Sequence, residues 1–184
     1  MSSQLDEAVM TLQQGGVIAY PTEAVWGVGC DPYNSEAVAK LLQLKNRHVD
    51  KGLILVAANV DQLQDLYLDL PDDLQARLLE PRAQPTTWLI EDKLNIIPRH
   101  IKGQHSAVAI RISAHPLVQA LCESFDGMIV STSANPSGFS PALSLQQCQS
   151  YFDLQVGCYV EGELGANDKP SQIIDLSSAV VLRS

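Results

Sequence analysis

Polar side chains stand at the ends of several short apolar runs, or beside them, and their types are those that bind anions. The main groups are Thr22-Glu23, the segment 45–51, the isolated Arg111, the stretch 131–135, and Ser171. Guanidinium and ammonium groups can hold a carboxylate or stabilise charge on a transferring phosphoryl group. We therefore expect an anion-binding cleft, with a nucleotide as its occupant and with hydroxyls and an amide to orient it.

The segment 45–51 carries three of the chain's twelve Lys and Arg residues, Lys45, Arg47 and Lys51. Cations at a helix end interact favourably with the helix dipole, so a solvated helix end is the plain alternative to a ligand site. The apolar run 53–57 predicts a buried strand, which would hold the basic segment between two packed elements. In a chain of net charge −9, this local concentration favours an anionic ligand.

Arg111 interrupts the apolar run 107–112, which otherwise predicts a buried strand. An unpaired charge in such a strand would be costly, so the guanidinium group must have a partner. Two partners remain open at this point. One is a carboxylate of the chain itself, and the other is a carboxylate or phosphate of a bound ligand.

Several common catalytic patterns are absent from the sequence. There is no G-x-S-x-G elbow and no Cys–His unit, and both Gly-rich phosphate loops, G-x-x-x-x-G-K-[ST] and G-x-G-x-x-G, are missing. The four histidines have no metal-binding spacing, so no metal site is expected. The four cysteines lack C-x-x-C spacing and are predicted to be free thiols in or near the core.

The composition is that of a globular protein, with 46% hydrophobic and 18% charged residues, and the length suits a single domain over residues 1–184. The net charge of −9 argues against a surface that as a whole grips nucleic acid. No run approaches the roughly 20 apolar residues of a membrane span, and the N-terminus lacks signal-peptide features. A cytoplasmic location without membrane attachment is therefore expected.

Hydrophobic periodicity predicts an α/β domain with a twisted mixed sheet flanked by helices. Strand 17–20 is expected to end at Pro21, which lacks a backbone donor, so that Thr22 and Glu23 begin a glycine-bearing turn. The hydroxyls from Ser131 onward are likewise expected in a turn after strand 128–130. Helices are expected at 3–14, 34–44, 61–80 with a break at Pro71, 115–124 and 144–152, and further strands at 53–57, 86–90, 107–112, 156–160, 173–176 and 180–183.

Five motifs, found in family order along the chain, resemble those of the YrdC/TsaC family of threonylcarbamoyl-AMP synthases. They are Tyr20 to Asp31, Lys45-x-Arg47 with Asp50 to Leu55, Val108 to Arg111, Ser131 to Asn135, and Pro170 to Asp175. The resemblance covers nearly the whole chain and its length matches the short single-domain form. It implies a YrdC-like fold with a large concave cleft.

The resemblance also implies a reaction, in which L-threonine, bicarbonate or CO2, and ATP give threonylcarbamoyl-adenylate and pyrophosphate. The product supplies the group placed on the adenosine beside the anticodon of certain tRNAs, so downstream threonylcarbamoyl-transfer proteins are implied partners, with weak contact to tRNA. The carbamate made from threonine attacks the α-phosphorus itself, which agrees with the missing nucleophile. Mg²⁺ would arrive with ATP.

Residue roles follow from the same resemblance. Lys45 and Arg47 would hold the triphosphate and act in catalysis by stabilising the departing pyrophosphate. The implied ATP-binding set is Lys45, Arg47, Lys51, Thr87, Ser133, Asn135, Ser137 and Arg183. Thr22, Thr132 and Ser171 would surround threonine, and Arg111 would pair with its carboxylate. Glu23 receives no role, and Trp26 is expected to pack in the core.

The chain departs from the family pattern at Arg82 to Pro85, where many relatives have Trp-Pro-Gly-Pro, and at Val56, where longer relatives have a histidine. Two other functions compete with the synthase. One is a non-catalytic RNA-binding module that uses the same basic cleft. The other is a carbamoyl-transfer domain of the kind found in hydrogenase-maturation proteins, against which the absence of zinc-finger cysteines counts.

Overall fold

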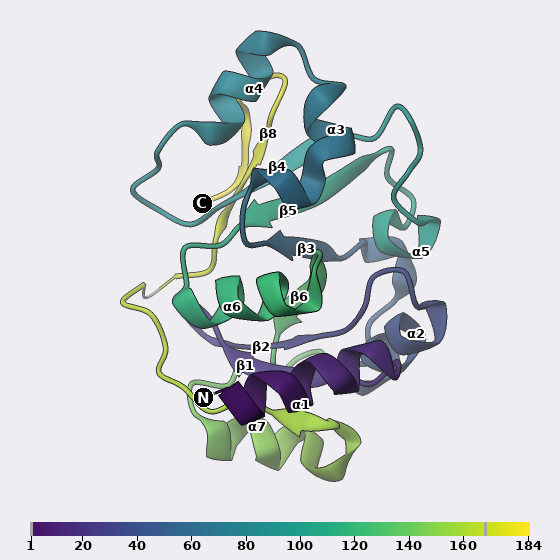
Figure 1. Ribbon diagram of the computed structural model, residues 1–184, viewed down its shortest axis with the longest axis vertical. Helices are drawn as coiled ribbons and strands as arrows, with labels where there is room; N and C mark the ends of the chain where they lie inside the picture. Colours follow the sequence, from purple (N-terminus) through teal and green to yellow (C-terminus); the bar gives the residue numbers. More distant parts are fainter. Residues whose placement is uncertain (1, 168) are drawn as a thin grey trace.

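The computed structural model describes residues 2–167 and 169–184 and is organised around one mixed β-sheet (Figure 1). Parallel pairs join β1 to β7, β3 to β5 and β4 to β8, and the other neighbours are antiparallel. The predicted mixed α/β architecture is confirmed. Across the sheet the strands are β7 (Cys158–Tyr159), β1 (Ile18–Pro21), β2 (Trp26–Gly29), β6 (Ile129–Ser133), β3 (Ile54–Ala57), β5 (Ala107–Ile112), β4 (Thr86–Glu91), β8 (Gln172–Asp175) and β9 (Val181–Arg183).

Helices cover the sheet, and α1 and α6 lie side by side across one face of it (Figure 1). The α-helices are α1 (Ser2–Gln13), α2 (Ser35–Leu44), α3 (Gln64–Leu68), α4 (Asp72–Leu79), α5 (Arg99–Lys102), α6 (Pro116–Phe125) and α7 (Leu145–Phe152). Short 3₁₀ turns are η1 (Val49–Lys51), η2 (Val60–Leu63) and η3 (Asp153–Gln155). The break expected at Pro71 is present between α3 and α4, whereas α5 lies in a stretch expected to be a loop.

At β1 the sheet is buried on both faces, and successive residues of the strand point to opposite faces. Ile18 and Tyr20 of β1 belong to the apolar cluster under α1 and α6. Val17 and Ala19 belong to a second cluster, which includes residues of α2 and α7. All four cysteines are buried and unpaired, as predicted.

The hairpin of β1 and β2 differs from the prediction. Pro21 is the last residue of β1 and pairs with Trp26. Residues 22–25 form the predicted turn, but the strand β2 that follows it was not predicted. Position 29 in this strand is occupied by glycine, because a Cβ there would stand 2.3 Å from the carbonyl oxygen of Val130. The glycines of β2 thus permit close packing of the strands. In the sequence alone, the same glycines predict a turn.

The polar residues of β6 also lie elsewhere than expected. Strand β6 continues through Ser133, so that Ser131 pairs with Ile54 of β3 and Thr132 with Val28 of β2. The predicted turn begins only after them. The central antiparallel strand therefore carries these hydroxyls on a rigid backbone.

Among the described residues, no helix combines the length and the apolar character needed to cross a membrane.

Candidate functional site

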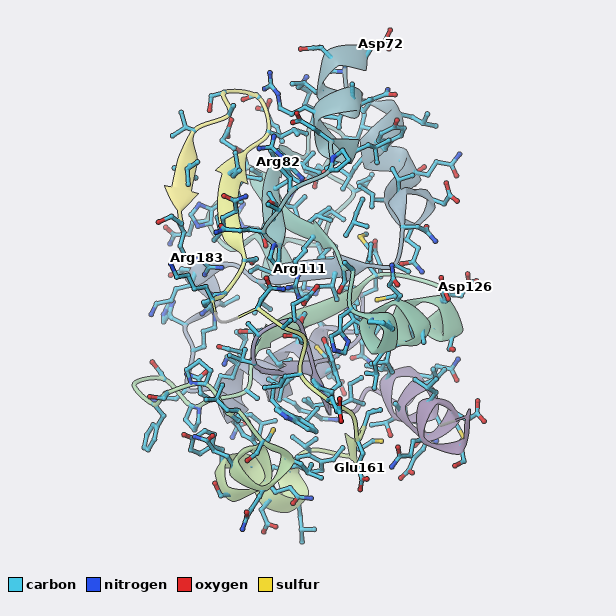
Figure 2. The ribbon with its side chains drawn as sticks, turned by 90° about the vertical axis from the view of Figure 1, so that its left-hand side faces the viewer. Asp72, Arg82, Arg111, Asp126, Glu161 and Arg183 are labelled. Atoms are coloured by element: carbon cyan, nitrogen blue, oxygen red, sulfur yellow. The ribbon has the colours of Figure 1, made fainter. Side chains whose placement is uncertain are left out.

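One cleft is lined by seven of the predicted site residues: Thr22, Arg47, Arg111, Thr132, Ser133, Ser171 and Arg183. They come from the β1–β2 turn, the segment after α2, and strands β5, β6 and β9, with Ser171 just before β8. Figure 2 shows Arg111 near the centre of the view and Arg183 to its left, and both line the cleft. Glu23, Ser131 and Lys169 line the cleft as well.

The β1–β2 turn forms one wall of the cleft and is tied down on two sides. The Thr22 hydroxyl donates to the carbonyl oxygen of Val25 at 2.7 Å, which leaves its lone pairs as acceptors. The segment that joins β7 to β8 crosses the turn, where the Gly165 amide donates to the Thr22 oxygen at 2.9 Å and the Asn167 amide to the Glu23 oxygen at 3.1 Å. A Cβ at Gly165 would lie 2.7 Å from the Glu23 oxygen, so this crossing requires glycine.

Arg111 forms a buried ion pair with Glu23. Of the two partners left open by the sequence, the carboxylate of the chain itself is therefore present. Nη1 of Arg111 lies 2.7 Å from Oε2 of Glu23, and the Ser113 hydroxyl donates to Oε1 at 2.6 Å. Burial alone would raise the pKa of Glu23, but the Arg111 charge and the Ser113 hydrogen bond outweigh it and hold the pKa below its ordinary value. Nε of Arg111 is buried and has no partner among the described residues.

Lys45 follows α2 and lies behind the cleft lining. The helix starts where predicted, with the Asn34 side chain accepting from the amides of Glu36 and Ala37, and Asn46 at φ 47° turns the chain after it. The Lys45 ammonium donates to the backbone oxygens of Ser133 and Asn135. Burial, followed by the charge of Arg47, lowers its pKa to about 8.

Arg47 reaches the cleft as a half-buried cation. Its Nη2 donates to the Gly52 oxygen at 2.9 Å, and no carboxylate of the described residues pairs with it. Burial lowers its pKa. The pKa of Arg183 is also lowered, by burial and then by the charge of Arg111. Cations held so close to one another favour an anion between them.

Ser171 is held by two residues from other strands. Its hydroxyl lies 2.8 Å from that of Thr87 in β4, and Nη2 of Arg183 in β9 donates to its backbone oxygen at 2.7 Å. Thr87 is 0% exposed, so its hydroxyl meets Ser171 and does not reach the cleft surface. Arg183 both lines the cleft and positions Ser171.

Five of the selected residues do not line this cleft. Lys45 and Thr87 support it from behind. The Asn135 side chain accepts from the Ser133 hydroxyl at 2.6 Å and donates to the Phe139 oxygen at 2.7 Å, which shapes the turn after β6. Ser137 is exposed, and Lys51 lines an adjoining hollow that shares Arg47 and Arg183 with the cleft.

Two charged residues that line the cleft had no predicted role. Lys169 directly precedes the Pro170-Ser171 pair, and this position in the sequence could have indicated that it lies in the cleft. Glu23 stands in the first motif, but its contact with Arg111 spans 88 positions and has no local signature. Trp26 is 3% exposed and packs in the core, as predicted.

A resident metal ion finds no ready ligand set here. Among the described residues, no group of three or more His, Cys, Asp or Glu side chains is placed to hold a metal ion. The one carboxylate among the described lining residues, Glu23, is committed to Arg111 and Ser113.

Comparison with known sequences identifies relatives over the whole chain. The Sua5/YciO/YrdC family model, described as "Telomere recombination", matches residues 10–184. A threonylcarbamoyl-AMP synthase of Acinetobacter baumannii is 46% identical over 189 residues, covering 100% of this chain and 99% of that protein. Another, from Saccharophagus degradans, is 50% identical over 181 residues, covering 98% and 94%.

Solved structures show the same fold. P. abyssi Sua5 complexed with L-threonine matches with a TM-score of 0.88 and 28% identity, over 100% of this chain. The match covers 54% of that protein, so this chain spans about half its length. E. coli YciO matches with a TM-score of 0.83 and 21% identity, covering 100% and 90%, a likeness of fold alone.

Proposed function

We infer that this chain, which belongs to the Sua5/YciO/YrdC family, is a threonylcarbamoyl-AMP synthase. It is a nucleotidyltransferase that uses L-threonine, bicarbonate or CO2, and ATP to form threonylcarbamoyl-adenylate and pyrophosphate, for modification of tRNA. The full-length relatives at 46% and 50% identity carry this name. The observation that carries the proposal is a cleft in which arginines from three separate segments converge with the threonine and serine hydroxyls.

The substrates are assigned to adjoining parts of the cleft. Threonine lies by Thr22, Thr132 and Ser171, with its carboxylate at Arg111. The triphosphate lies by Arg47 and Arg183, with Ser133 oriented by Asn135. Support for the first assignment comes from the neutral Glu23–Arg111 pair, which suits an amino acid. Support for the second comes from the cations Arg47 and Arg183, which have no carboxylate partner among the described residues.

The chemistry then rests on positioning and electrostatics. The threonine amine and bicarbonate give a carbamate and water, and a carbamate oxygen attacks the α-phosphorus of ATP. The bond from the α-phosphorus to the bridging oxygen breaks, and pyrophosphate leaves with that oxygen and its electron pair. Arg47, supported by Lys45 behind the cleft, stabilises the charge that develops on this leaving group. No side-chain nucleophile is needed.

Mg²⁺ enters as part of the MgATP substrate. Oxygen ligands from the phosphates and water suit this ion, which keeps much of its water shell. This fits a cleft whose single described carboxylate is already paired. Lys51, in the adjoining hollow, is placed to reach the outer part of the nucleotide.

Three further assignments complete the proposal. The 184 residues act as one domain, the protein works in the cytoplasm, and its adenylate product passes to threonylcarbamoyl-transfer proteins with weak contact to tRNA. A non-catalytic RNA-binding role is disfavoured, because the full-length relatives are named as synthases.

Pyrophosphate release tests the function. Purified protein is incubated with MgATP, threonine and bicarbonate, each omitted in turn, while the adenylate product is followed by mass spectrometry. We expect pyrophosphate and adenylate in equal amounts and only with all three substrates. Release that is independent of threonine, or no release under any condition, would contradict the proposal.

A further inference from the structure

Glu23 is a buried carboxylate in the wall of the cleft. It has no role in the proposed reaction. It is 5% exposed, and both of its oxygens are occupied. Oε2 meets Nη1 of Arg111 at 2.7 Å, and Oε1 accepts from the Ser113 hydroxyl at 2.6 Å. The Ser113 oxygen in turn accepts from the His115 amide at 3.2 Å, so the carboxylate is fixed from behind by strand β5 and the start of α6.

The backbone of Glu23 is fixed as well. The Asn167 amide donates to its carbonyl oxygen, and the Gly165 amide donates to that of Thr22. Neither the side chain nor the backbone of Glu23 is therefore free to turn. A residue held this firmly can orient its neighbour.

That neighbour is Arg111, which is 9% exposed and lines the cleft. Glu23 takes one terminal nitrogen, Nη1. On the other edge of the guanidinium group, Nε is buried and has no partner among the described residues. A guanidinium edge formed by Nε and Nη2 matches the two oxygens of a carboxylate. Tying Nη1 to Glu23 thus directs the opposite edge to a ligand.

Charge gives Glu23 a second effect. The described lining residues include the cations Arg47, Arg111, Lys169 and Arg183 and a single acid, Glu23. Glu23 neutralises Arg111, whereas no carboxylate among the described residues pairs with Arg47 or Arg183. A zwitterionic amino acid fits beside the neutral Glu23–Arg111 pair, whereas polyanionic phosphate is favoured beside cations without a carboxylate partner.

We propose that Glu23 is a positioning and specificity-determining residue, which orients Arg111 for the threonine carboxylate and keeps phosphate groups out of the amino-acid subsite. This inference rests on the proposed function. It predicts that a neutral residue at position 23 exposes an uncompensated guanidinium group, which then accepts inorganic phosphate in place of threonine.

The test compares Glu23→Gln with Ser113→Ala and with Glu161→Gln, an exposed carboxylate on the segment before β8 (Figure 2). Glu23→Gln preserves size and removes charge. Ser113→Ala preserves the charge and removes one hydrogen bond that holds it. Glu161→Gln changes the net charge of the protein by the same amount as Glu23→Gln, away from Arg111. Threonine binding is measured by calorimetry without ATP, and KM for threonine and for ATP by pyrophosphate release.

In Glu23→Gln we expect threonine affinity to fall by about tenfold or more, since a charge-assisted contact is misplaced, while KM for ATP is unchanged. Inorganic phosphate should compete with threonine in this variant and not in the wild type. Ser113→Ala should weaken threonine binding without admitting phosphate, and Glu161→Gln should match the wild type. A protein that is merely destabilised would not gain a phosphate site.

Equal losses in KM for threonine and ATP, or unchanged threonine affinity without phosphate competition, would overturn the inference. If Glu23→Gln does not fold, as judged by urea unfolding, unchanged threonine affinity in Ser113→Ala would overturn it alone. The proposed function fails separately, when the wild type binds threonine but forms no adenylate.

Discussion

The ammonium group of Lys45 lies 2.8 Å from the backbone oxygen of Asn135, 90 positions further along the chain. The same nitrogen also donates to the backbone oxygen of Ser133. Lys45 thereby joins the end of α2 to the end of β6, where Ser133 lines the cleft, and to the turn that follows. The first basic residue of the Lys45-x-Arg47 motif acts from behind the lining, and the second, Arg47, faces the cleft.

Binding of ATP is expected to be accompanied by proton uptake at Lys45. Burial and Arg47 lower the pKa of Lys45 to about 8 in the free protein, from 10.5. The phosphates of ATP favour the charged form and raise this pKa again. Between about pH 8 and 10 the free protein is therefore partly deprotonated at Lys45, and the complex regains the proton.

Calorimetry in buffers of different ionisation enthalpy measures this uptake at pH 8.5 to 9. Lys45→Met should abolish it, whereas Lys40→Met, which removes an exposed cation of α2, should leave it intact. Uptake of the same size in both variants would show that another group is responsible. No uptake in the wild type would place the phosphates out of reach of Lys45.

Arg47→Ala should weaken ATP binding much more than threonine binding. The guanidinium group lines the cleft without a carboxylate partner among the described residues, so its charge is available to the triphosphate. Loss of a charge-assisted contact of about 1.5–3 kcal/mol corresponds to a rise in KM for ATP of about tenfold or more. Arg99→Ala, an exposed arginine of α5, serves as the control and should change neither KM. Parallel losses for both substrates in Arg47→Ala would indicate damage to the fold.

The contiguous motifs explain why most of the cleft could be predicted from the sequence. Thr22, Arg47 and Ser171 each follow or precede an apolar run with strong periodicity, and the fold brings those ends together. Strand β2 could not be recognised, because Gly27 and Gly29 resemble a turn locally. Their reason for being glycine is the close approach of Tyr20, Thr22 and the β6 backbone, which is a tertiary contact.

The roles of several polar residues could not be assigned from the sequence for a similar reason. Arg111 had two open partners, and the choice of Glu23 depends on how β5 lies against the β1–β2 turn. Thr87 is expected at the nucleotide from the resemblance, and its hydroxyl contact with Ser171 depends on how β4 lies beside β8. The spacing of residues along the chain does not predict the distance between two side chains that lie on separate strands.

Thr87→Val is expected to affect threonine more than ATP. The substitution preserves shape and removes the hydroxyl that orients Ser171 at 2.8 Å, in a site that is 0% exposed. We expect a loss of about 1 kcal/mol in the free energy of unfolding and a severalfold rise in KM for threonine. The measurements are urea unfolding and substrate titrations. A rise in KM for ATP alone would instead support direct contact between Thr87 and the nucleotide. Thr86→Val, at the neighbouring position, is the control for stability.

Gly29→Ala should disrupt the centre of the sheet. The new Cβ would lie 2.3 Å from the Val130 oxygen and 2.9 Å from the Tyr20 hydroxyl, and the first of these is backbone that cannot move away cheaply. Strand β2 would have to separate from β6, which carries Thr132 and Ser133 to the cleft. A loss of about 1–3 kcal/mol or more in the free energy of unfolding is expected, together with loss of binding for both substrates. Gly127→Ala is the matched control, because the nearest atom to its Cβ would be Cδ1 of Phe125 at 4.0 Å. Equal stability of the two variants in urea would contradict the close packing of β2 against β6. It would also contradict the inference that Gly29 is required for this packing and not for a turn.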